Sequence, residues 1–369
     1  RWFAAHADTL LARALAWSRD HRVLGRYSMA VFDPQRRESV SLALLAVMLI
    51  AFGWIAFAFL ALVIGHGEPL AIDLAIHESM LALRNPLADH PMAALASLGD
   101  VEVLAPASLL VLGYLTWRKR WMAAAHWLAA LAFGLALTAW LGAMVDFPRP
   151  PAVATGFSFP SISITMSTIC FGFFAVLIAR ELPGRKRIWP YMVSGIVVAL
   201  IGFARIYLGA HWLSDVIGGM LLGIFWLLVL GIAYRRRTVR SFWMKPLAIL
   251  FYGAVAIAAL WHAPRNIEPM LAQFEVPQTI STMVLESWWE NDWKELPARR
   301  NEFDDEQRWP LDVQVAGPLQ ALRLQLESEG WRVQQQAGWQ EALNLLDNDV
   351  PDVQQPVLPA TLDTHAESL

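Results

Sequence analysis

Residues 214–234 read SDVIGGMLLGIFWLLVLGIAY, an apolar run whose one charged residue, Asp215, stands near its beginning. A helix of about 20 such residues is long enough to cross the roughly 30 Å hydrocarbon core of a bilayer. Three arginines follow at once, Arg235, Arg236 and Arg237, and mark the return to water. The stretch therefore predicts a membrane-spanning helix and places the chain among membrane proteins.

Comparable apolar runs recur on both sides of this one. The chain is 56% hydrophobic and only 17% charged, which is more apolar than a soluble core requires. Before the second run, residues 70–98 favour an amphipathic or re-entrant segment. The expected fold is therefore all-α, a polytopic transmembrane helical bundle. The seven predicted spans are residues 40–64, 101–117, 121–144, 163–180, 188–206, 214–234 and 243–262.

The charge of the chain excludes one broad class of function. Its formal net charge is −3 and its basic residues form short scattered clusters, so nucleic acid is not an expected partner. Cys170 is the one cysteine and lies in an apolar run, which rules out an intrachain disulfide. We also expect no cofactor and no metal site.

Basic residues are concentrated in every second connection between the predicted spans. Short cytoplasmic loops carry an excess of Lys and Arg, so these connections are expected in the cytoplasm. The connections 65–100, 145–160 and 207–213 then face outward, and so do residues 264–369. The basic residues that set this orientation are Arg36, Arg37, Arg118, Lys119, Arg120, Arg185, Lys186, Arg187, Arg235, Arg236, Arg237 and Arg240.

Polar side chains gather at the outward ends of the third to sixth spans. Two arginines, a histidine and an aspartate arrive there from different helices, on the side where positive charge is least expected. Charge at a membrane boundary is costly unless it is used or paired, so the gathering favours a functional site over snorkelling anchors. These residues are Asp146, Arg149, Pro150, Ser158, Pro160, Ser161, Ser163, Arg205, His211 and Asp215.

The segment from Arg205 to Asp215 carries the sharpest signal. His211 and Asp215 are four residues apart, a spacing that puts two side chains on one face of a helix. The carboxylate can then hold one ring nitrogen and leave the other free to attack an electrophile. A structural pair is the simpler explanation of the spacing alone. The arginine six residues upstream and the surrounding Gly-x-His-Trp-x-Ser-Asp pattern favour function.

The segment 142–215 resembles the type 2 phosphatidic acid phosphatase and haloperoxidase superfamily. The three motifs of that family are Lys-x6-Arg-Pro, Pro-Ser-Gly-His and Ser-Arg-x5-His-x3-Asp. The resemblance covers roughly residues 40–234 and implies a six-helix phosphatase-like core plus one extra span. The residues that match the motifs, in order and with the spacing of the family, are Arg149, Pro150, Pro160, Ser161, Arg205, His211 and Asp215.

The resemblance implies a role for each matching polar residue. His211 is the nucleophile that attacks phosphorus to give a phosphohistidine, and Asp215 orients it. Arg149, Ser161 and Arg205 hold the phosphate oxygens, a task that suits planar guanidinium donors. The implied substrate is a membrane lipid or lipid-linked phosphate.

Several motif positions depart from the family. Gly142 stands at the position of the motif-one lysine, and Ala204 replaces the serine of the third motif. Ile162 and Ser163 replace the glycine and the histidine of the second motif, which makes Ser163 a degenerate acid position. A missing general acid typically costs about 10²–10⁴ in rate. Asp146 is expected to compete with an anionic substrate for the nearby arginine.

Three further histidines, His66, His77 and His90, lie on the predicted outward side and are candidates to replace the missing acid. For each of them an ordinary interfacial or loop position is the simpler interpretation.

The parts outside the bundle have a different composition. Residues 1–39 form an amphipathic cytoplasmic N-terminal segment, 40–262 the transmembrane phosphatase-like bundle, and 263–369 a small soluble α+β domain. Within the last, residues 311–317 alternate like a strand and 318–329 predict an amphipathic helix.

The C-terminal domain resembles the LssY-type domain that follows lipid phosphatase bundles in bacterial envelope proteins. Some of those proteins carry a DedA-like membrane domain upstream, and the chain begins at Arg1 rather than Met. An upstream membrane domain and an envelope protein partner are therefore expected. The expected location is the bacterial inner membrane, with the site and the C-terminal domain on the periplasmic side.

Two functions remain open at this point. One is an integral membrane phosphatase-type hydrolase that acts on lipid-linked phosphate or diphosphate; a diphosphate leaving group lessens the need for the missing acid. The other is a catalytically inactive pseudo-phosphatase that binds lipid headgroups or serves as an envelope scaffold. A transporter is disfavoured, because no paired discontinuous helices recur in two halves of the chain.

Overall fold

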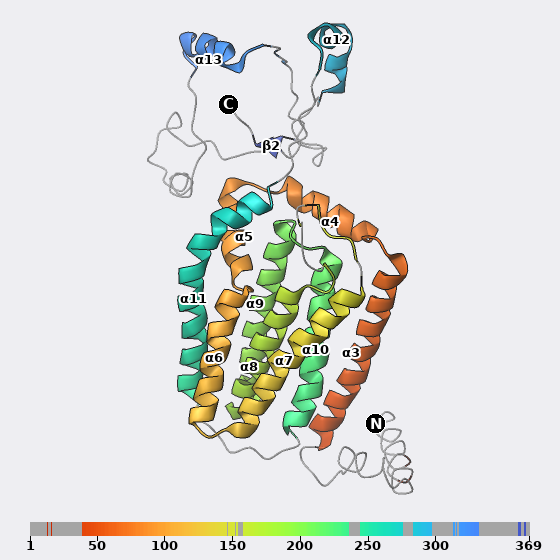
Figure 1. Ribbon diagram of the computed structural model, residues 1–369, viewed down its shortest axis with the longest axis vertical. Helices are drawn as coiled ribbons and strands as arrows, with labels where there is room; N and C mark the ends of the chain where they lie inside the picture. The colour runs from red at the N-terminus through yellow and green to blue at the C-terminus, as the bar shows by residue number, and fades with distance from the viewer. Residues whose placement is uncertain are drawn as a thin grey trace.

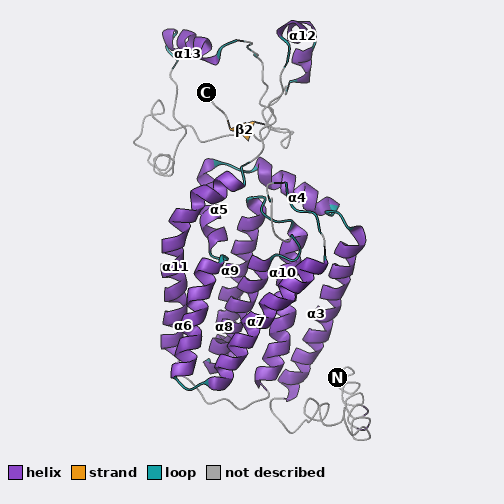
Figure 2. Ribbon diagram, viewed as in Figure 1, coloured by secondary structure: helices purple, strands orange, loops and turns teal. Residues whose placement is uncertain are grey.

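The computed structural model shows a bundle of long helices that run side by side (Figure 1 and Figure 2). It describes residues 39–145, 147–151, 158–235, 244–275, 283–296 and 317–331, together with 13, 16, 153, 313, 315, 361–362 and 365–366. Within these residues, seven helical stretches are long and apolar enough to cross a membrane. The fold is therefore an all-α polytopic bundle, as predicted.

The seven long helices coincide with the predicted spans, and apart from the end of the last one their bounds differ by at most two residues. They are α3 (Ser39–His66), α6 (Val101–Trp117), α7 (Trp121–Met144), α8 (Ile162–Glu181), α9 (Ile188–Tyr207), α10 (Leu213–Arg235) and α11 (Met244–Gln273). The basic connection between α8 and α9 includes a short 3-10 helix, η1 (Gly184–Arg187).

Helix α8 is the central helix of the bundle. It packs against α7, α9 and α10, and most of its side chains are buried. An aromatic cluster joins it to its neighbours: the rings of Phe174 and Phe251 stack at 3.9 Å, and Trp127 meets both edge-on. Because α8 is enclosed on all sides, its N-terminal end is held firmly where the polar residues gather.

The region between the first two spans forms two short helices, α4 (Ala71–Ala82) and α5 (Pro86–Ser97). Helix α4 lies across one end of the bundle (Figure 1). Helix α5 is followed by a break at 98–100 and then by α6, and together they make one apolar stretch from Pro86 to Trp117. The expected amphipathic or re-entrant segment is thus a cap followed by a broken helix.

Helix α11 extends beyond the predicted end of its span at residue 262. It continues through Pro264 and Pro269 to Gln273, although each proline removes a backbone donor. Burial of Met270 and Phe274 in a cluster with residues of α5 and α9 compensates for that loss. At about 1.5 Å per residue a helix of 30 residues is about 45 Å long, so its last turns extend beyond a 30 Å hydrocarbon core.

The described C-terminal residues contain short elements. These are α12 (Leu285–Glu290), η2 (Asp292–Glu295), α13 (Leu319–Ser328) and an antiparallel pair of two-residue strands, β1 (Thr361–Leu362) and β2 (His365–Ala366). Helix α13 confirms the helix expected at 318–329, and Gly330 follows it with a φ of +90°, a helix-ending conformation that glycine favours. Val313 and Val315, from the expected strand at 311–317, are exposed and belong to no strand. An alternating pattern forms a strand only where a neighbouring strand pairs with it.

Candidate active site

The site lies where α8, α9 and α10 meet, at the end of the bundle that carries α4. Arg205 is in the last turn of α9, His211 in the loop that follows, Asp215 in the first turn of α10, and Ser161 directly before α8. Helix α9 has 20 residues and is about 30 Å long, which puts Arg205 near one boundary of the hydrocarbon core. The structure thus brings these four predicted residues together.

The loop from α9 to α10 turns sharply at Gly209, whose φ of +71° is a conformation that L side chains rarely adopt. A hydrogen bond from the Ala210 amide to the Arg205 carbonyl, 3.0 Å long, closes the turn. His211 therefore lies in the loop, two residues before α10 begins. The expectation that His211 and Asp215 share one helical face is wrong, because the chain reverses direction between the arginine and the aspartate.

Asp215 is fully buried, and its Oδ2 accepts two hydrogen bonds. The Ser158 hydroxyl donates at 2.7 Å and the Trp212 amide at 3.0 Å. The same oxygen faces His211 Nδ1 at 3.5 Å, which is an ion-pair distance but long for a hydrogen bond. The carboxylate is thus fixed by its own donors and lies beside the imidazole, whose Nδ1 is buried and makes no hydrogen bond to a described residue. That Asp215 orients His211 stays a prediction.

The other ring nitrogen of His211 faces the residue that precedes α8. Its Nε2 lies 3.2 Å from the hydroxyl oxygen of Ser161, which is fully buried. Helix α10 approaches this point closely, since a Cβ added at Gly219 would lie 2.9 Å from the Ser161 carbonyl oxygen. A predicted phosphate-binding residue therefore lies directly in front of the nitrogen that would attack.

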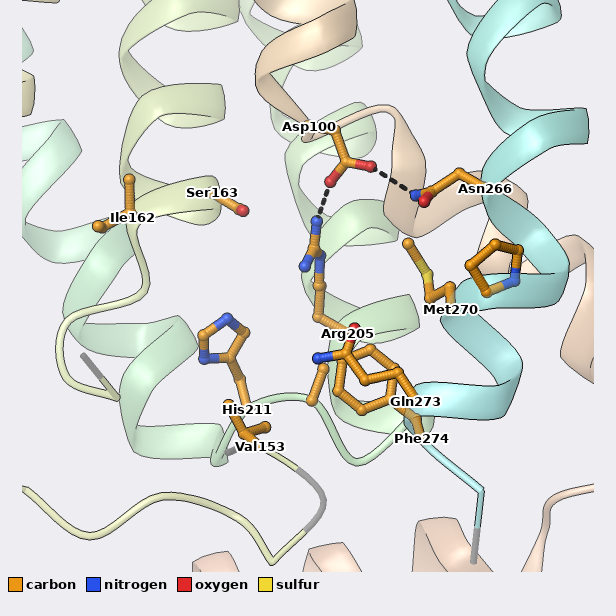
Figure 3. A pocket seen from close by; sticks show the side chains of 12 residues that line it. Asp100, Val153, Ile162, Ser163, Arg205, His211, Asn266, Met270, Gln273 and Phe274 are labelled. Atoms are coloured by element: carbon orange, nitrogen blue, oxygen red, sulfur yellow. Dashed lines mark hydrogen bonds and ion pairs between the residues drawn. The ribbon is translucent and has the colours of Figure 1, made fainter. Parts of the chain in front are cut away.

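A pocket of about 360 Å³ opens beside His211. Figure 3 shows His211, Ser163 and Arg205 pointing into it from three different elements. Helix α11 forms the opposite wall. The lining residues are Asp100, Val153, Ile162, Ser163, Arg205, Ala210, His211, Asn266, Pro269, Met270, Gln273 and Phe274.

Arg205 lines this pocket, and its guanidinium is held from the side of α5 and α6. Its Nη2 donates to the Ala96 carbonyl at 3.3 Å and pairs with the carboxylate of Asp100. Its Nε is buried and has no hydrogen-bond partner among the described residues. A guanidinium on the wall of a pocket is a donor group that suits phosphate oxygens, so Arg205 favours an anionic ligand there.

The partners of this arginine were missed by the sequence analysis. Asp100 stands at the break between α5 and α6, and its Oδ2 lies 2.9 Å from His262 Nε2 and 3.1 Å from Asn266 Nδ2. His262 and Asn266 are four apart on α11, a spacing that places them on one face and was the available signal. Their pairing with an aspartate more than 160 positions away had no local signal.

Among the described residues, Asp100 also belongs to the one group whose side chains could together hold a metal ion. Single ligand atoms of Asp100, Glu102 and His262 lie within 4.8 Å of one another. Arg205 already provides a positive charge on the Asp100 carboxylate, which opposes the binding of a cation there. The absence of a resident metal stays a prediction.

The other predicted site residues have different positions. Ser163 and Ile162 line the pocket in the first turn of α8. Arg149 is half-buried and is not among the described residues that line the pocket. Gly142 is buried in α7, and Asp146 lies outside the described residues.

None of the three alternative acid histidines lines the described pocket. His77 packs against the Trp212 ring at 4.9 Å, behind the loop that carries His211. Burial lowers the pKa of His77, and the negative charge of Glu78 opposes that shift in part. His90 pairs with Glu268 at 3.3 Å, and His66 is exposed at the end of α3. The structure thus offers no direct substitute for the missing acid among these residues.

The fold and this geometry define a membrane-embedded helical bundle with a histidine, serine and arginine pocket at one end. Residues 144–239 match the PAP2 superfamily, and the chain carries a PAP2 superfamily domain. The matched segment contains α8, α9 and α10 and excludes Asp100 and α11.

Two relatives accompany this match. Phosphatidylglycerophosphatase B of Bacillus subtilis (strain 168) is 27% identical over 177 residues, which are 46% of this chain and 86% of that protein. The crystal structure of the first transmembrane PAP2 type phosphatidylglycerolphosphate phosphatase from Bacillus subtilis aligns with a TM-score of 0.45 and 25% identity. That alignment covers 50% of this chain and 97% of the other.

Proposed function

We propose that the protein is a phosphatase-like membrane protein that binds lipid-linked phosphate or diphosphate at the outer face of the bacterial inner membrane. One observation carries the proposal: Arg205 and His211, which stand on different elements, line the same pocket. The matched PAP2 domain contains both residues. The named relative is a phosphatidylglycerophosphatase, which makes a lipid phosphomonoester one substrate to test.

The proposed reaction has two steps. His211 Nε2 attacks phosphorus, the P–N bond forms, and the bond from phosphorus to the leaving oxygen breaks. Buried Asp215 stabilises the positive charge that develops on the imidazole, and Arg205 stabilises the negative charge on the phosphoryl oxygens. Water then attacks phosphorus and loses a proton, the P–N bond breaks, and inorganic phosphate leaves as free His211 is restored. An alkoxide leaving group takes up one proton from solvent, which balances the proton that the attacking water loses.

A second candidate is headgroup binding without turnover. Two observations favour it: Ser163 occupies the pocket wall at the acid position, and Asp100 already engages Arg205. A serine hydroxyl is a poor acid for protonating an alkoxide leaving group at neutral pH. The protein would then be a pseudo-phosphatase whose pocket recognises a lipid headgroup without hydrolysing it.

Arg205→Ala is expected to weaken binding of a short-chain lipid phosphate by more than tenfold. A hydrogen bond to a charged group contributes about 1.5–3 kcal/mol, and 1.4 kcal/mol corresponds to a factor of ten. The measurement is calorimetric titration of the detergent-solubilised protein with dihexanoyl phosphatidic acid. Arg265→Ala is the matched control, since Arg265 is an exposed arginine of α11 outside the pocket. Equal affinities for parent and Arg205→Ala would refute the proposed function.

The sidedness of the site can be tested by cysteine labelling. Native Cys170 is buried, so the parent protein should react little with an impermeant thiol reagent. Glu68 is exposed at the same end of the bundle as the pocket, and Arg185 is exposed at the end with the basic loops. In intact spheroplasts, Glu68→Cys should be labelled and Arg185→Cys should not. The opposite pattern would place the pocket in the cytoplasm.

The remaining assignments are part of the proposal. The predicted domain boundary at 263 is wrong, because α11 continues to Gln273 and packs on the bundle. The part of the chain after α11 is proposed as an LssY-like domain on the periplasmic side, with an envelope protein as partner. An upstream DedA-like membrane domain belongs to the same proposal.

A further inference from the structure

Asp100 joins a predicted phosphate-binding arginine to a helix that the PAP2 match does not include. One carboxylate oxygen pairs with Arg205 of α9, and the other faces His262 Nε2 at 2.9 Å and Asn266 Nδ2 at 3.1 Å on α11. Figure 3 shows the contacts from Asp100 to Arg205 and to Asn266. Arg205 lies within the matched segment 144–239, whereas the three residues that hold it from behind lie outside that segment.

This link is largely shielded from water. The side chains of Arg205, Asp100 and His262 are 11%, 15% and 13% exposed. Ion pairs and hydrogen bonds are stronger in such a low-dielectric setting than at a surface, and removing one partner of a buried charge is costly. The position of the guanidinium is therefore expected to depend on what holds the carboxylate from the other side.

Asp100 forgoes a capping role to make this link. It stands at the N-cap of α6, where an aspartate ordinarily accepts a hydrogen bond from the backbone of the first turn. Its side chain makes no such bond to the described residues of α6. The turn that carries it fits closely, because a Cβ added at Gly99 would lie 2.9 Å from Cγ2 of Ile201 on α9. The carboxylate is thus directed at the guanidinium instead of its own helix.

We propose that His262 and Asn266 position Arg205 for phosphate binding through Asp100. The two residues of α11 act through the carboxylate, so they are positioning residues. A guanidinium fixed in advance binds phosphate oxygens better than one that must be ordered on binding, because ordering a long side chain costs affinity. This inference rests on the proposed function and adds to it a part of the chain outside the PAP2 match.

The test is calorimetric titration of the detergent-solubilised protein with dihexanoyl phosphatidic acid. His262→Phe keeps an aromatic ring but loses the donor to Asp100, and it should weaken binding about tenfold; in metal sites the loss of such a supporting partner costs about 10–100-fold. His262→Gln keeps an uncharged donor and should restore most of the affinity, which separates positioning from a change of charge. Glu102→Gln is the matched control and should leave the affinity unchanged, because Glu102 lies 4.0 Å from His262 but is half-exposed and outside the pocket.

A double-mutant cycle shows whether the effect passes through the arginine. In an Arg205→Ala background, His262→Phe should cause no further loss of affinity. Asn266→Leu removes the second donor to the same carboxylate oxygen and should follow the same pattern. It therefore keeps the proposal testable if the His262→Phe protein does not fold.

Three results would overturn the positioning role while the proposed function stands. They are unchanged affinity in both His262→Phe and Asn266→Leu, an equal loss of affinity with and without Arg205, and a loss in His262→Gln as large as that in His262→Phe. Unchanged binding in Arg205→Ala would overturn the proposed function together with the positioning role.

Discussion

Replacing His211 with alanine is expected to lower phosphate release from a lipid phosphate by at least about 10³-fold. Removing a nucleophile eliminates the covalent route, and only binding and electrostatic stabilisation by the pocket remain. Asp215 would stay held by Ser158 and Trp212, so the change should leave the fold intact. The measurement is release of inorganic phosphate by the purified protein from a panel of short-chain lipid monophosphates and diphosphates.

The control for this experiment is His90→Ala. His90 is an exposed histidine at the same end of the bundle and lies outside the pocket. Its removal should not change the rate. Equal rates for parent and His211→Ala would show that the released phosphate does not come from the proposed reaction.

Ser163→His is expected to raise phosphate release by about 10²-fold or more. The residue lines the pocket with His211, so a histidine there can protonate the leaving oxygen, an effect typically worth about 10²–10⁴. Ser163→Asn, which changes the size without adding an acid, is the matched control.

The fuller repair adds Gly142→Lys and Ile162→Gly, which restore the binding cation and the close backbone approach. No gain in a folded triple variant would mean that the pocket has changed beyond those positions.

The membrane spans could be predicted because their signal is local. About 20 apolar residues bounded by basic loops specify a spanning helix by themselves, and this holds for α3 and α6 to α10. The end of α11 could not be predicted in this way. Pro264 and Pro269 are ordinary stop signals, and tertiary burial of Met270 and Phe274 against α5 and α9 overrides them.

The candidate site likewise has a part that local sequence motifs predict and a part that they do not. His211, Asp215, Ser161 and Arg205 stand in short motifs, and the structure brings them together as expected. The ion pair of Arg205 with Asp100 joins residues 105 positions apart, and no motif announces it. From the sequence, Asp146 is expected to compete with an anionic substrate for the nearby Arg149. In the structure, the carboxylate that pairs with a predicted phosphate-binding arginine is that of Asp100, and the arginine is Arg205.

The central claim is that His211 attacks phosphorus in this pocket, and covalent capture tests it most directly. The purified protein is mixed with a short-chain lipid phosphate, quenched rapidly in alkali, and digested for mass spectrometry. We expect a phosphoryl group on the peptide that contains His211, and no such group in His211→Ala. In Asp215→Asn the amount of phosphorylated peptide should increase if breakdown of the phosphohistidine slows more than its formation. Phosphate release without any phosphoryl group on His211, or with the group on another residue, would contradict the account.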